Sequence, residues 1–558
     1  MTVAEALRAL EGARTERTSL AAARRLDAMD VLAGARLSTS KQVERLHEAL
    51  CFLRAWPDDE LVLAKVESLL ARFARRPDLA RHRAALEDSG IAGTKTRFPF
   101  FAGTARWLAA RWSGKLRVDW KAFEKGPALE RLLPLVSLWA ETPALDELDL
   151  GTRGWVKRLK GPKETDAAYL VRRLATLGNG TFEKEWIWES LELPLVLDPG
   201  PDTPARTNAC LRTAPVVFQT RPLDRGRPDV RRALARPPLS IEPVPPREAA
   251  RYIDLAREAM VARQRDLDAF QWGDAGDVRL VTYPDGLSFA AIGVVPERRL
   301  LLESVYGFLT LKNGVPIGYV LTSALFGSSE IAYNVFDTFR GGESGLVYGK
   351  VLSMTRALFG SDVFTIFPYQ LGGYGNPEAL ESGAWWFYRK LGFVPRAPRA
   401  VALMEVEERR MAADPKHRTS RADLKILASE NLYWFAGKAR RDAIGLVELP
   451  NVGLAVVDAV ASRFGSDRER AEAVLSAEAG RLLGARTGAW SPAERLALRR
   501  WAPLVSILPG VAGWTPAEKR ALLAVIRAKG GRRESDFVRL FDAHRKLRRA
   551  IVTLAKER

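Results

Sequence analysis

Hydrophobic and polar positions follow two different rhythms along this chain, and the change of rhythm divides it into regions. From residue 1 to about 190, apolar residues recur at helical spacing, as in STSKQVERLHEALCFLRAW, which begins with a serine suited to capping a helix. From about 238 to 410, short extended segments replace most of the helices, and after 410 the helical spacing returns. The pattern predicts an α+β chain, with a central mixed sheet and helices flanked by all-α N-terminal and C-terminal regions.

Proline marks the boundary between the first two regions. The stretch from Pro194 to Pro246 holds 12 of the 32 prolines of the chain, and DPGPDTP is its most broken segment. We therefore predict a helical N-terminal domain (1–190), a Pro-rich linker (191–237) with APVVFQT as its one candidate strand, an α+β domain (238–410) and a helical, basic C-terminal domain (411–558). In the last part, WSPAERLAL and WTPAEKRALL repeat 24 residues apart with matching capping signals, which predicts a helix pair.

The central domain has a specific order of elements. PLSIEPVPP predicts a strand and REAARYIDLAREAMVARQRDLDAF a long helix. Five strands then follow as DVRLVTY, LSFAAIGVV, VYGFLTLK, VPIGYVLTSAL and SEIAYNVFDTF, with Asn313-Gly314 as a strong hairpin signal. RGGESGLVYGKVLSMTRALFG is a glycine-rich turn that opens a helix, and DVFTIFPYQ is another strand. An aromatic helix, GAWWFYRKLGF, and a final hairpin close the domain.

The aromatic helix has a structural interpretation that requires no chemistry. Ala384, Tyr388 and Leu391 share one helix face, and Gly392 stands where a left-handed residue would end the helix. Aromatic stripes at helical spacing usually pack into a core. An ordinary buried helix end therefore stands beside any functional interpretation of these rings.

This order of elements resembles that of the GNAT superfamily of acyl-CoA-dependent N-acyltransferases, and the resemblance covers about 170 of the 558 residues. Two motifs are its most specific parts. VFDTFRGGESG is similar to the family's strand followed by R-x-x-G-x-G/A, with Arg340 and Gly345 at matching positions and Val335 at the family's apolar position. FYRKLGF is similar to the Y-x-K-L-G-F end of the family's fourth helix, with Tyr388 at the position of the family's tyrosine.

The resemblance implies that acetyl-CoA or another acyl-CoA is a co-substrate. In the family, the amides of the glycine turn bind the coenzyme A pyrophosphate, and a helix N-terminus is suited to this role because its unpaired N–H groups attract phosphate. Glu343 departs from the pattern, because it occupies the place of the first motif glycine. It either repels the anion or points outward and caps the helix. The residues implied in cofactor binding are Val335, Arg340, Gly341, Gly342, Ser344 and Gly345.

The resemblance also implies catalytic roles. Tyr388 is expected to protonate the CoA thiolate as it leaves, a task that suits a phenol in a partly apolar pocket. Glu330 or Asp337 is expected to deprotonate an acceptor amine through a water, although each also fits a solvent-facing acid on a strand. Trp385 and Trp386 either wall the acyl or acceptor pocket or fill the core behind it.

Charge adds an expectation about partners. The net charge is +19, and from Lys519 to the end there are 13 Lys and Arg against 4 Asp and Glu, a net +9. We expect at most weak, non-specific binding of nucleic acid or another anionic surface through this basic C-terminus. The residues expected to carry it are Arg545, Lys546, Arg548 and Arg549.

The composition argues against other classes of protein. Two cysteines, Cys51 and Cys210, and four scattered histidines predict neither a disulfide framework nor a metal site. Neither a run of 18 apolar residues nor a signal peptide is visible, so we expect a cytoplasmic protein without a transmembrane segment. A P-loop is excluded because Ser344 and Val351 stand where Gly and Ser or Thr are needed. A Ser–His–Asp triad is disfavoured because no histidine lies between His82 and His417.

Three functions stay open at this point. The first is a GNAT-like N-acyltransferase that acts on an unidentified amine. The second is a Fem-type aminoacyl transferase that uses aminoacyl-tRNA, which the basic surface fits, although a tandem second GNAT unit is not visible. The third is a GNAT-like scaffold that has lost catalysis, which Glu343 favours.

Overall fold

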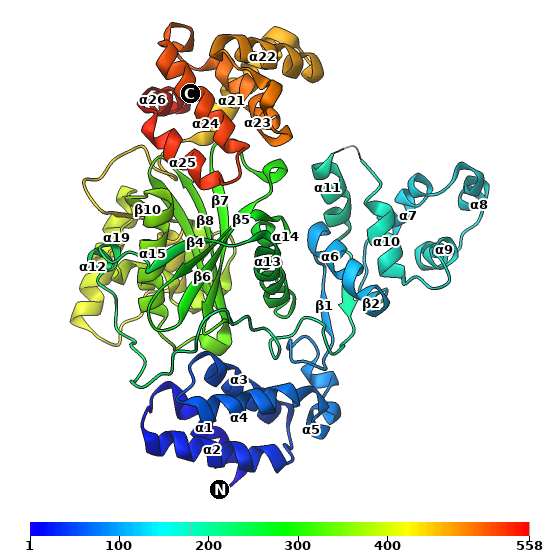
Figure 1. The fold of residues 1–558 in the computed structure, drawn as a ribbon, viewed down its shortest axis with the longest axis vertical. Helices are drawn as coiled ribbons and strands as arrows, with labels where there is room; N and C mark the ends of the chain where they lie inside the picture. Colours follow the sequence, from blue (N-terminus) through cyan, green and yellow to red (C-terminus); the bar gives the residue numbers. More distant parts are fainter. Residues whose placement is uncertain (179, 557–558) are drawn as a thin grey trace.

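The first 95 residues form a helical domain at one end of the molecule (Figure 1). The structure is a computed structural model and describes residues 1–178 and 180–556. Threonines cap three of the first helices, because Thr2, Thr18 and Thr39 each accept a hydrogen bond from an amide of the first turn. The helices are α1 (Val3–Glu11), α2 (Ser19–Gly34), α3 (Ser40–Ala55), α4 (Glu60–Ala71) and α5 (Pro77–Arg81).

The next hundred residues form a second body with an apolar core of its own. This part was expected to be all-α, but it contains an antiparallel three-stranded sheet in the order β1-β3-β2. Each strand has only three residues, too few for a visible alternation of polar and apolar positions. The strands are β1 (Thr96–Phe98), β2 (Leu116–Val118) and β3 (Leu195–Leu197); the helices are α6 (Ala102–Trp112), α7 (Gly126–Leu132), α8 (Thr142–Glu147), α9 (Gly151–Leu159), α10 (Asp166–Leu174) and α11 (Thr181–Leu191).

The Pro-rich connection crosses the surface of the molecule and holds one short helix, α12 (Val230–Leu234). The strand expected at APVVFQT is absent. The amide of Val217 donates to the side chain of Asn313 (3.0 Å), and that of Gln219 donates to the carbonyl of Pro57 (2.8 Å). These contacts tie the segment to the hairpin turn and to the N-terminal domain, so its amides do not bond to a neighbouring strand.

An eight-stranded sheet lies at the centre of the molecule, with the strands in the order β11-β10-β9-β8-β7-β6-β5-β4. All neighbouring strands are antiparallel except β9 and β10, which run parallel. Asn313 and Gly314 both have positive φ in the turn between β7 and β8, which confirms the predicted hairpin. The strands are β4 (Ser240–Pro243), β5 (Gly273–Thr282), β6 (Leu287–Val294), β7 (Ser304–Lys312), β8 (Val315–Leu325), β9 (Ser328–Val335), β10 (Val363–Ile366) and β11 (Leu432–Phe435).

Helices cover both faces of this sheet. On β9, Tyr333 packs against Tyr348 of α15 (Ser344–Phe359), with ring centroids 5.3 Å apart. Tyr319 of β8 points to the opposite face, where its ring meets Phe270 of α14 (Asp268–Gln271). The long helix predicted before β5 is shorter than expected: α13 (Pro246–Val261) ends in a turn where Gln264 has a positive φ.

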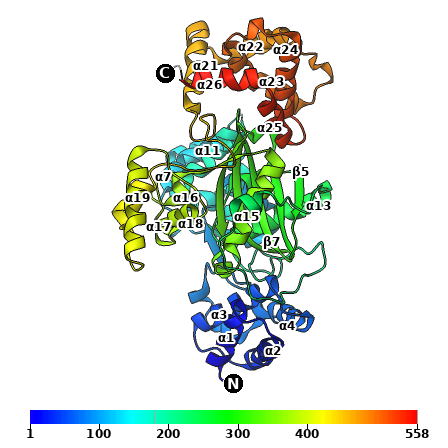
Figure 2. The same cartoon turned by 90° about the vertical axis from the view of Figure 1, so that its left-hand side faces the viewer.

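The last part of the central domain also differs from the prediction. The expected final hairpin is absent, because Val394 makes only an isolated bridge to Tyr433 of β11. Two helices separate these residues, so the sheet is completed beyond residue 410. Figure 2 shows α16, α17, α18 and α19 together beside the sheet. The helices are α16 (Pro368–Leu371), α17 (Pro377–Glu381), α18 (Ala384–Lys390), α19 (Pro398–Ala413) and α20 (Arg421–Leu427).

The C-terminal helices form a bundle at the opposite end from the N-terminus (Figure 1). Both predicted capping boxes are present, at Ser491 with Glu494 and at Thr515 with Glu518, which confirms the helix pair. Within the described residues, no helix is long and apolar enough to cross a membrane. The helices are α21 (Leu449–Phe464), α22 (Arg468–Leu483), α23 (Pro492–Ile507), α24 (Pro516–Lys529), α25 (Glu534–Ala543) and α26 (Arg545–Lys556).

Candidate functional site

The two parallel strands separate at one end of their pairing. The register joins Ser328 to Val363 and ends at Glu330 with Thr365. Beyond that point β9 continues to Val335, while the segment that follows β10 turns away into α16. The amides of alternate residues in this part of β9 point away from β8, towards the opening. The pairing of the two strands therefore ends at Glu330 and Thr365, and residues 331–335 of β9 have no partner among the described strands on this side.

Helix α15 begins beside this opening and joins the two parallel strands. Its N-terminus follows the glycine turn, in which Gly341 adopts a positive φ of 87°. The hydroxyl of Tyr333 donates to the carbonyl of Ser344 (3.1 Å), which fixes the first turn of the helix against β9. The helix has no side-chain cap at its N-terminus. Amides of its first turn are thus available for an anion.

Glu343 points away from this turn and joins the central domain to its neighbours. Its carboxylate accepts from the indole of Trp56 (3.4 Å) and from the amide of Asp224 (3.4 Å). The ammonium group of Lys312 lies 3.9 Å away, and burial lowers the pKa of that lysine. Neither predicted role fits, because Glu343 does not cap the helix and its charge is balanced by Lys312. Glu343 therefore replaces the motif glycine as a residue that joins the central domain to Trp56 and to the linker.

A basic groove of about 1210 Å³ opens at the N-terminus of α15. Gly341, Gly342, Ser344 and Gly345 line it, so four of the residues expected to bind a cofactor meet in one place. One carboxylate, Glu408, also lines it and is paired with a groove arginine (2.8 Å). The basic residues that line the groove come from the linker, α18 and the segment after α19: Arg225, Arg227, Arg389, Lys390 and Arg418.

The linker forms one wall of the groove, a feature that sequence reasoning missed. A Cβ atom added to Gly345 would lie 3.0 Å from the carbonyl oxygen of Gly226 and 3.2 Å from Pro228. The close approach of these backbones explains the glycine. The only signal in the sequence is the basic run RPLDRGRP, which a linker could carry without any function.

Arg340 and Val335 lie at the edge of the site. The guanidinium of Arg340 pairs with Asp337 (2.8 Å) and with Glu378 of α17 (2.6 Å), and its side chain is 45% exposed. Its Nε donates to the carbonyl of Val335 (3.4 Å). Neither residue lines the groove. Arg340 therefore ties the end of β9 to α17, and its charge is already matched by two carboxylates.

Tyr388 lies within an aromatic cluster behind the groove. Its side chain is buried, and its ring contacts Tyr348 (5.4 Å between centroids) and Phe393 (5.8 Å). Burial raises the pKa of its hydroxyl. Burial raises the pKa of the Tyr333 phenol, and the nearby Tyr388 raises it further. Tyr388 is thus directed towards the junction of β9 and α15, but it does not line the groove itself.

The sequence left open whether Trp385 and Trp386 wall a pocket or fill the core, and the structure gives one role to each. Trp385 is 1% exposed, and its indole donates to the carbonyl of Leu427 (3.0 Å), so it belongs to the core. Trp386 lines the groove, and its indole donates to the hydroxyl of Thr419 (3.0 Å). The predicted helix end is confirmed, because Gly392 follows α18 with a φ of 95°.

This division predicts different costs for the two rings. Replacement of Trp385 by alanine is expected to lower the free energy of unfolding by about 3–5 kcal/mol, because it empties a closed core site. Replacement of Trp386 by alanine should cost about 1–2 kcal/mol, because its ring is partly exposed and lines the groove. Chemical denaturation of both variants measures the difference. Equal costs would contradict the separate assignments.

Glu330 is a mostly buried carboxyl group without a partner. No hydrogen bond or ion pair joins it to another residue in the described parts of the chain. Burial, together with the nearby charge of Glu303, raises the pKa of Glu330 to about 7. It lies on the face of the sheet opposite to Tyr333, where the sheet begins to open. Asp337, the other predicted base, is exposed and paired with Arg340 (2.8 Å).

The raised pKa predicts a pH-dependent effect on stability. Glu330 has an ordinary pKa of 4.5 when exposed and about 7 in the fold, so its ionisation destabilises the folded protein as the pH rises between these values. Glu330→Gln removes this loss. The variant is expected to equal the parent at about pH 4 and to exceed it by up to about 3 kcal/mol at about pH 8.

Denaturant titrations at several pH values measure this gain. Glu381→Gln serves as the matched control, because the side chain of Glu381 is 73% exposed. A difference between Glu330→Gln and the parent that stays constant with pH would show that Glu330 titrates like an exposed acid.

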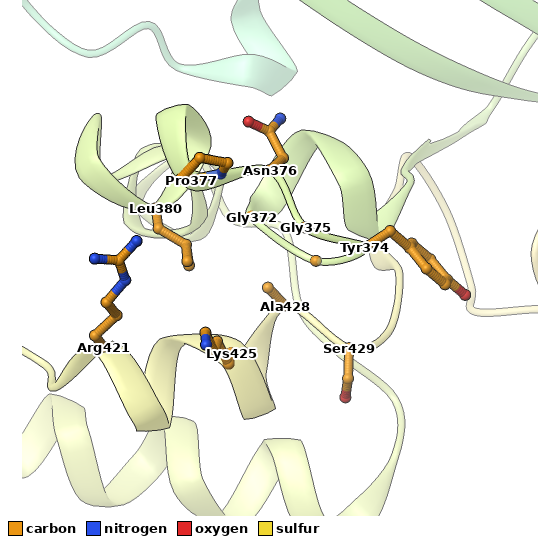
Figure 3. Close-up of a pocket in the computed structure, with 11 residues that line it drawn as sticks. Gly372, Tyr374, Gly375, Asn376, Pro377, Leu380, Arg421, Lys425, Ala428 and Ser429 are labelled. Atoms are coloured by element: carbon orange, nitrogen blue, oxygen red, sulfur yellow. The ribbon is translucent and has the colours of Figure 1, made fainter.

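A smaller cavity of about 570 Å³ lies beyond the end of β10 (Figure 3). The glycine-rich stretch from Gly372 to Asn376 forms one side, and Arg421 and Lys425 of α20 point towards it from the other. Gly373 is required there because a Cβ atom would lie 2.3 Å from the carbonyl oxygen of Ala428. None of the predicted site residues lines this cavity.

The basic C-terminal helix is partly committed to packing. Lys546 pairs with Glu518 (2.8 Å), and Arg548 pairs with Asp442 (2.6 Å) at the contact with the central domain. Arg545 and Arg549 are exposed. Two of the four residues expected to bind an anion thus already have carboxylate partners, while the expectation itself stays a prediction.

No arrangement of three or more His, Cys, Asp or Glu that could hold a metal ion occurs among the residues that the structure describes. Comparison with known proteins supplies no relative: no protein-family model, curated protein or solved structure matches this chain.

Proposed function

We propose that the chain is an N-acyltransferase of GNAT-like design, which transfers an acyl group from acyl-CoA to an amine. The observation that carries the proposal is the basic groove at the uncapped N-terminus of α15, beside the place where β9 and β10 separate. Five basic residues and the amides of a helix start suit the phosphates of coenzyme A. The motif residues Gly341, Gly342, Ser344 and Gly345 line this groove.

The proposed reaction is a direct transfer between two bound substrates. The pantetheine arm of acyl-CoA passes between β9 and β10, and amides of β9 polarise the thioester carbonyl. Glu330 takes a proton from the amine through a water, for which its pKa of about 7 is well matched. The amine nitrogen bonds to the carbonyl carbon, the carbon–sulfur bond breaks, and the thiolate takes the proton of Tyr388. Glu330 then releases its proton to solvent, and a proton from solvent restores the tyrosine.

A scaffold without catalysis is the second candidate, because of one specific observation. Tyr388 is buried among aromatic rings and does not line the groove. If the ring stays there when acyl-CoA binds, the groove would hold a ligand without transferring its acyl group. Binding and turnover must therefore be measured separately.

Calorimetric titration with acetyl-CoA and with CoA tests binding. We expect acetyl-CoA to bind the full-length protein with a dissociation constant in the micromolar range. CoA should bind with similar strength, because the phosphates provide most of the contacts. If neither an acetyl nor a longer acyl-CoA produces a heat of binding, the proposed enzyme is excluded. Binding without release of CoA thiol in the presence of amines would support the scaffold.

A further inference from the structure

A second basic cavity lies in the C-terminal helical domain, at the opposite end of the molecule from the N-terminus. It has a volume of about 1080 Å³ and is bounded mainly by α22 and α23, which Figure 1 shows side by side at the top. The charged residues that line it are four arginines and one acid: Arg481, Arg486, Arg495, Arg499 and Glu297. None of the residues of the proposed acyltransferase site contributes to it.

The four arginines differ in whether they already form an ion pair or a hydrogen bond within the protein. Arg499 pairs with Glu472 (2.5 Å), and Arg495 donates to the carbonyl of Trp490. Arg481 and Arg486 have neither an ion pair nor a hydrogen bond from their guanidinium groups to any residue that the structure describes. Two exposed guanidinium groups thus border the same cavity and present hydrogen-bond donors that the described fold does not use, although the charge of Arg481 also acts on Glu478.

The interior of the cavity supplies a second feature that points to a ligand. The hydroxyl oxygen of Ser476 is buried and lacks a hydrogen-bond partner among the described residues. Buried hydroxyl groups are usually hydrogen-bonded, so this one is suited to a ligand. Gly480 leaves the adjacent surface open, since nothing lies within 4 Å of a Cβ atom placed there. Leu496 and the buried Leu498 line the cavity beside these polar groups and form its apolar floor.

We propose that this cavity binds a phosphate ester. Arginine rather than lysine provides every cation, and its planar group donates two parallel hydrogen bonds to phosphate oxygens. Arg481 and Arg486 hold the phosphate, Ser476 donates a further hydrogen bond, and the apolar floor carries the organic part of the ester. The cavity, and not the C-terminal helix with its paired Lys546 and Arg548, is then the anion site of this domain.

Titration of the full-length protein tests the proposal with three probes: inorganic phosphate, adenosine monophosphate and a single-stranded RNA of 12 nucleotides. We expect saturable binding of at least one probe. In a variant with both Arg481→Ala and Arg486→Ala, the dissociation constant should rise at least tenfold. Ser476→Ala should raise it several-fold. Arg486→Lys should have an intermediate effect, because it keeps the charge but loses the planar group.

A matched control separates this site from the general positive charge. The double variant Arg468→Ala with Arg470→Ala removes two arginines that lie on α22, the helix that carries Arg481, but do not line the cavity. It should leave every dissociation constant unchanged. Cavity-dependent binding of adenosine monophosphate identifies a small ester, and cavity-dependent binding of RNA alone identifies a nucleic-acid backbone. If no probe binds, or if cavity and control variants weaken binding equally, the proposal is wrong. Probe binding should persist in Gly345→Leu, whatever that substitution does to acyl-CoA.

Discussion

Replacement of Tyr388 by phenylalanine is expected to lower turnover roughly 10²–10⁴-fold while acyl-CoA affinity stays the same. The substitution removes one hydroxyl group and almost no volume. No described residue forms a hydrogen bond with that hydroxyl, so the free energy of unfolding should change by less than about 1 kcal/mol. A loss of rate would then reflect a missing proton donor and not a damaged fold. Release of CoA thiol, measured against a panel of amines, follows the rate.

Tyr348 provides the matched control, because it lies in the same aromatic cluster and its buried hydroxyl also lacks a partner among the described residues. Tyr348→Phe removes the same atom from α15 instead of α18, and its turnover should equal that of the parent. An unchanged rate in Tyr388→Phe would leave the ring with a packing role only. Equal losses in both variants would show that the rate depends on the cluster and not on one proton donor.

Strands β5 to β9 of the central sheet were predictable because each is long enough to show its own pattern. Short turns join β5 to β6, β7 to β8 and β8 to β9, and Asn313-Gly314 fixes the register of β7 on β8. Pairing between neighbours in the sequence requires only local signals. The glycine turn and the helix between β9 and β10 were predicted as well, but the parallel pairing of the two strands was not and comes from the structure.

The missed elements depend on partners far away in the sequence. Strand β11 pairs with β10 across more than 60 residues, and the hairpin expected at Val394 is only a single bridge to the same strand. The three-residue strands β1, β2 and β3 are too short to carry a period. Their existence follows from a separate core that packs around them, and a core cannot be deduced from one segment at a time.

The candidate site was also predictable only where its residues are close together in the sequence. The motif indicated the turn from Gly341 to Gly345, and in the structure all of these residues except Glu343 line one groove. It could not indicate Arg227, which reaches the groove from a linker, or explain Glu343, which bonds to Trp56 almost 300 residues earlier. Residue types at short spacing predict local geometry. Contacts between charged residues that are far apart in the sequence can be seen only in the three-dimensional structure.

Replacement of Gly345 by leucine is expected to weaken acetyl-CoA binding at least 100-fold. A Cβ atom at this position already comes within 3.0 Å of the carbonyl oxygen of Gly226, so the leucine side chain must displace the linker wall or fill the groove. Either outcome removes the space in which phosphates would reach the amides of α15. Gly345→Ala adds only the first atom of that side chain and should weaken binding less.

The test separates a lost site from a lost fold. Gly453→Leu is the matched control, since Gly453 lies on an exposed face of α21 with nothing within 4 Å of an added Cβ atom. Thermal unfolding of both leucine variants should stay cooperative, and only Gly345→Leu should lose the heat of acetyl-CoA binding. If Gly345→Leu folds and binds acetyl-CoA as tightly as the parent, the ligand does not lie at the start of α15. The basic groove would then need a different ligand, because a side chain at Gly345 stands between its linker wall and the start of α15.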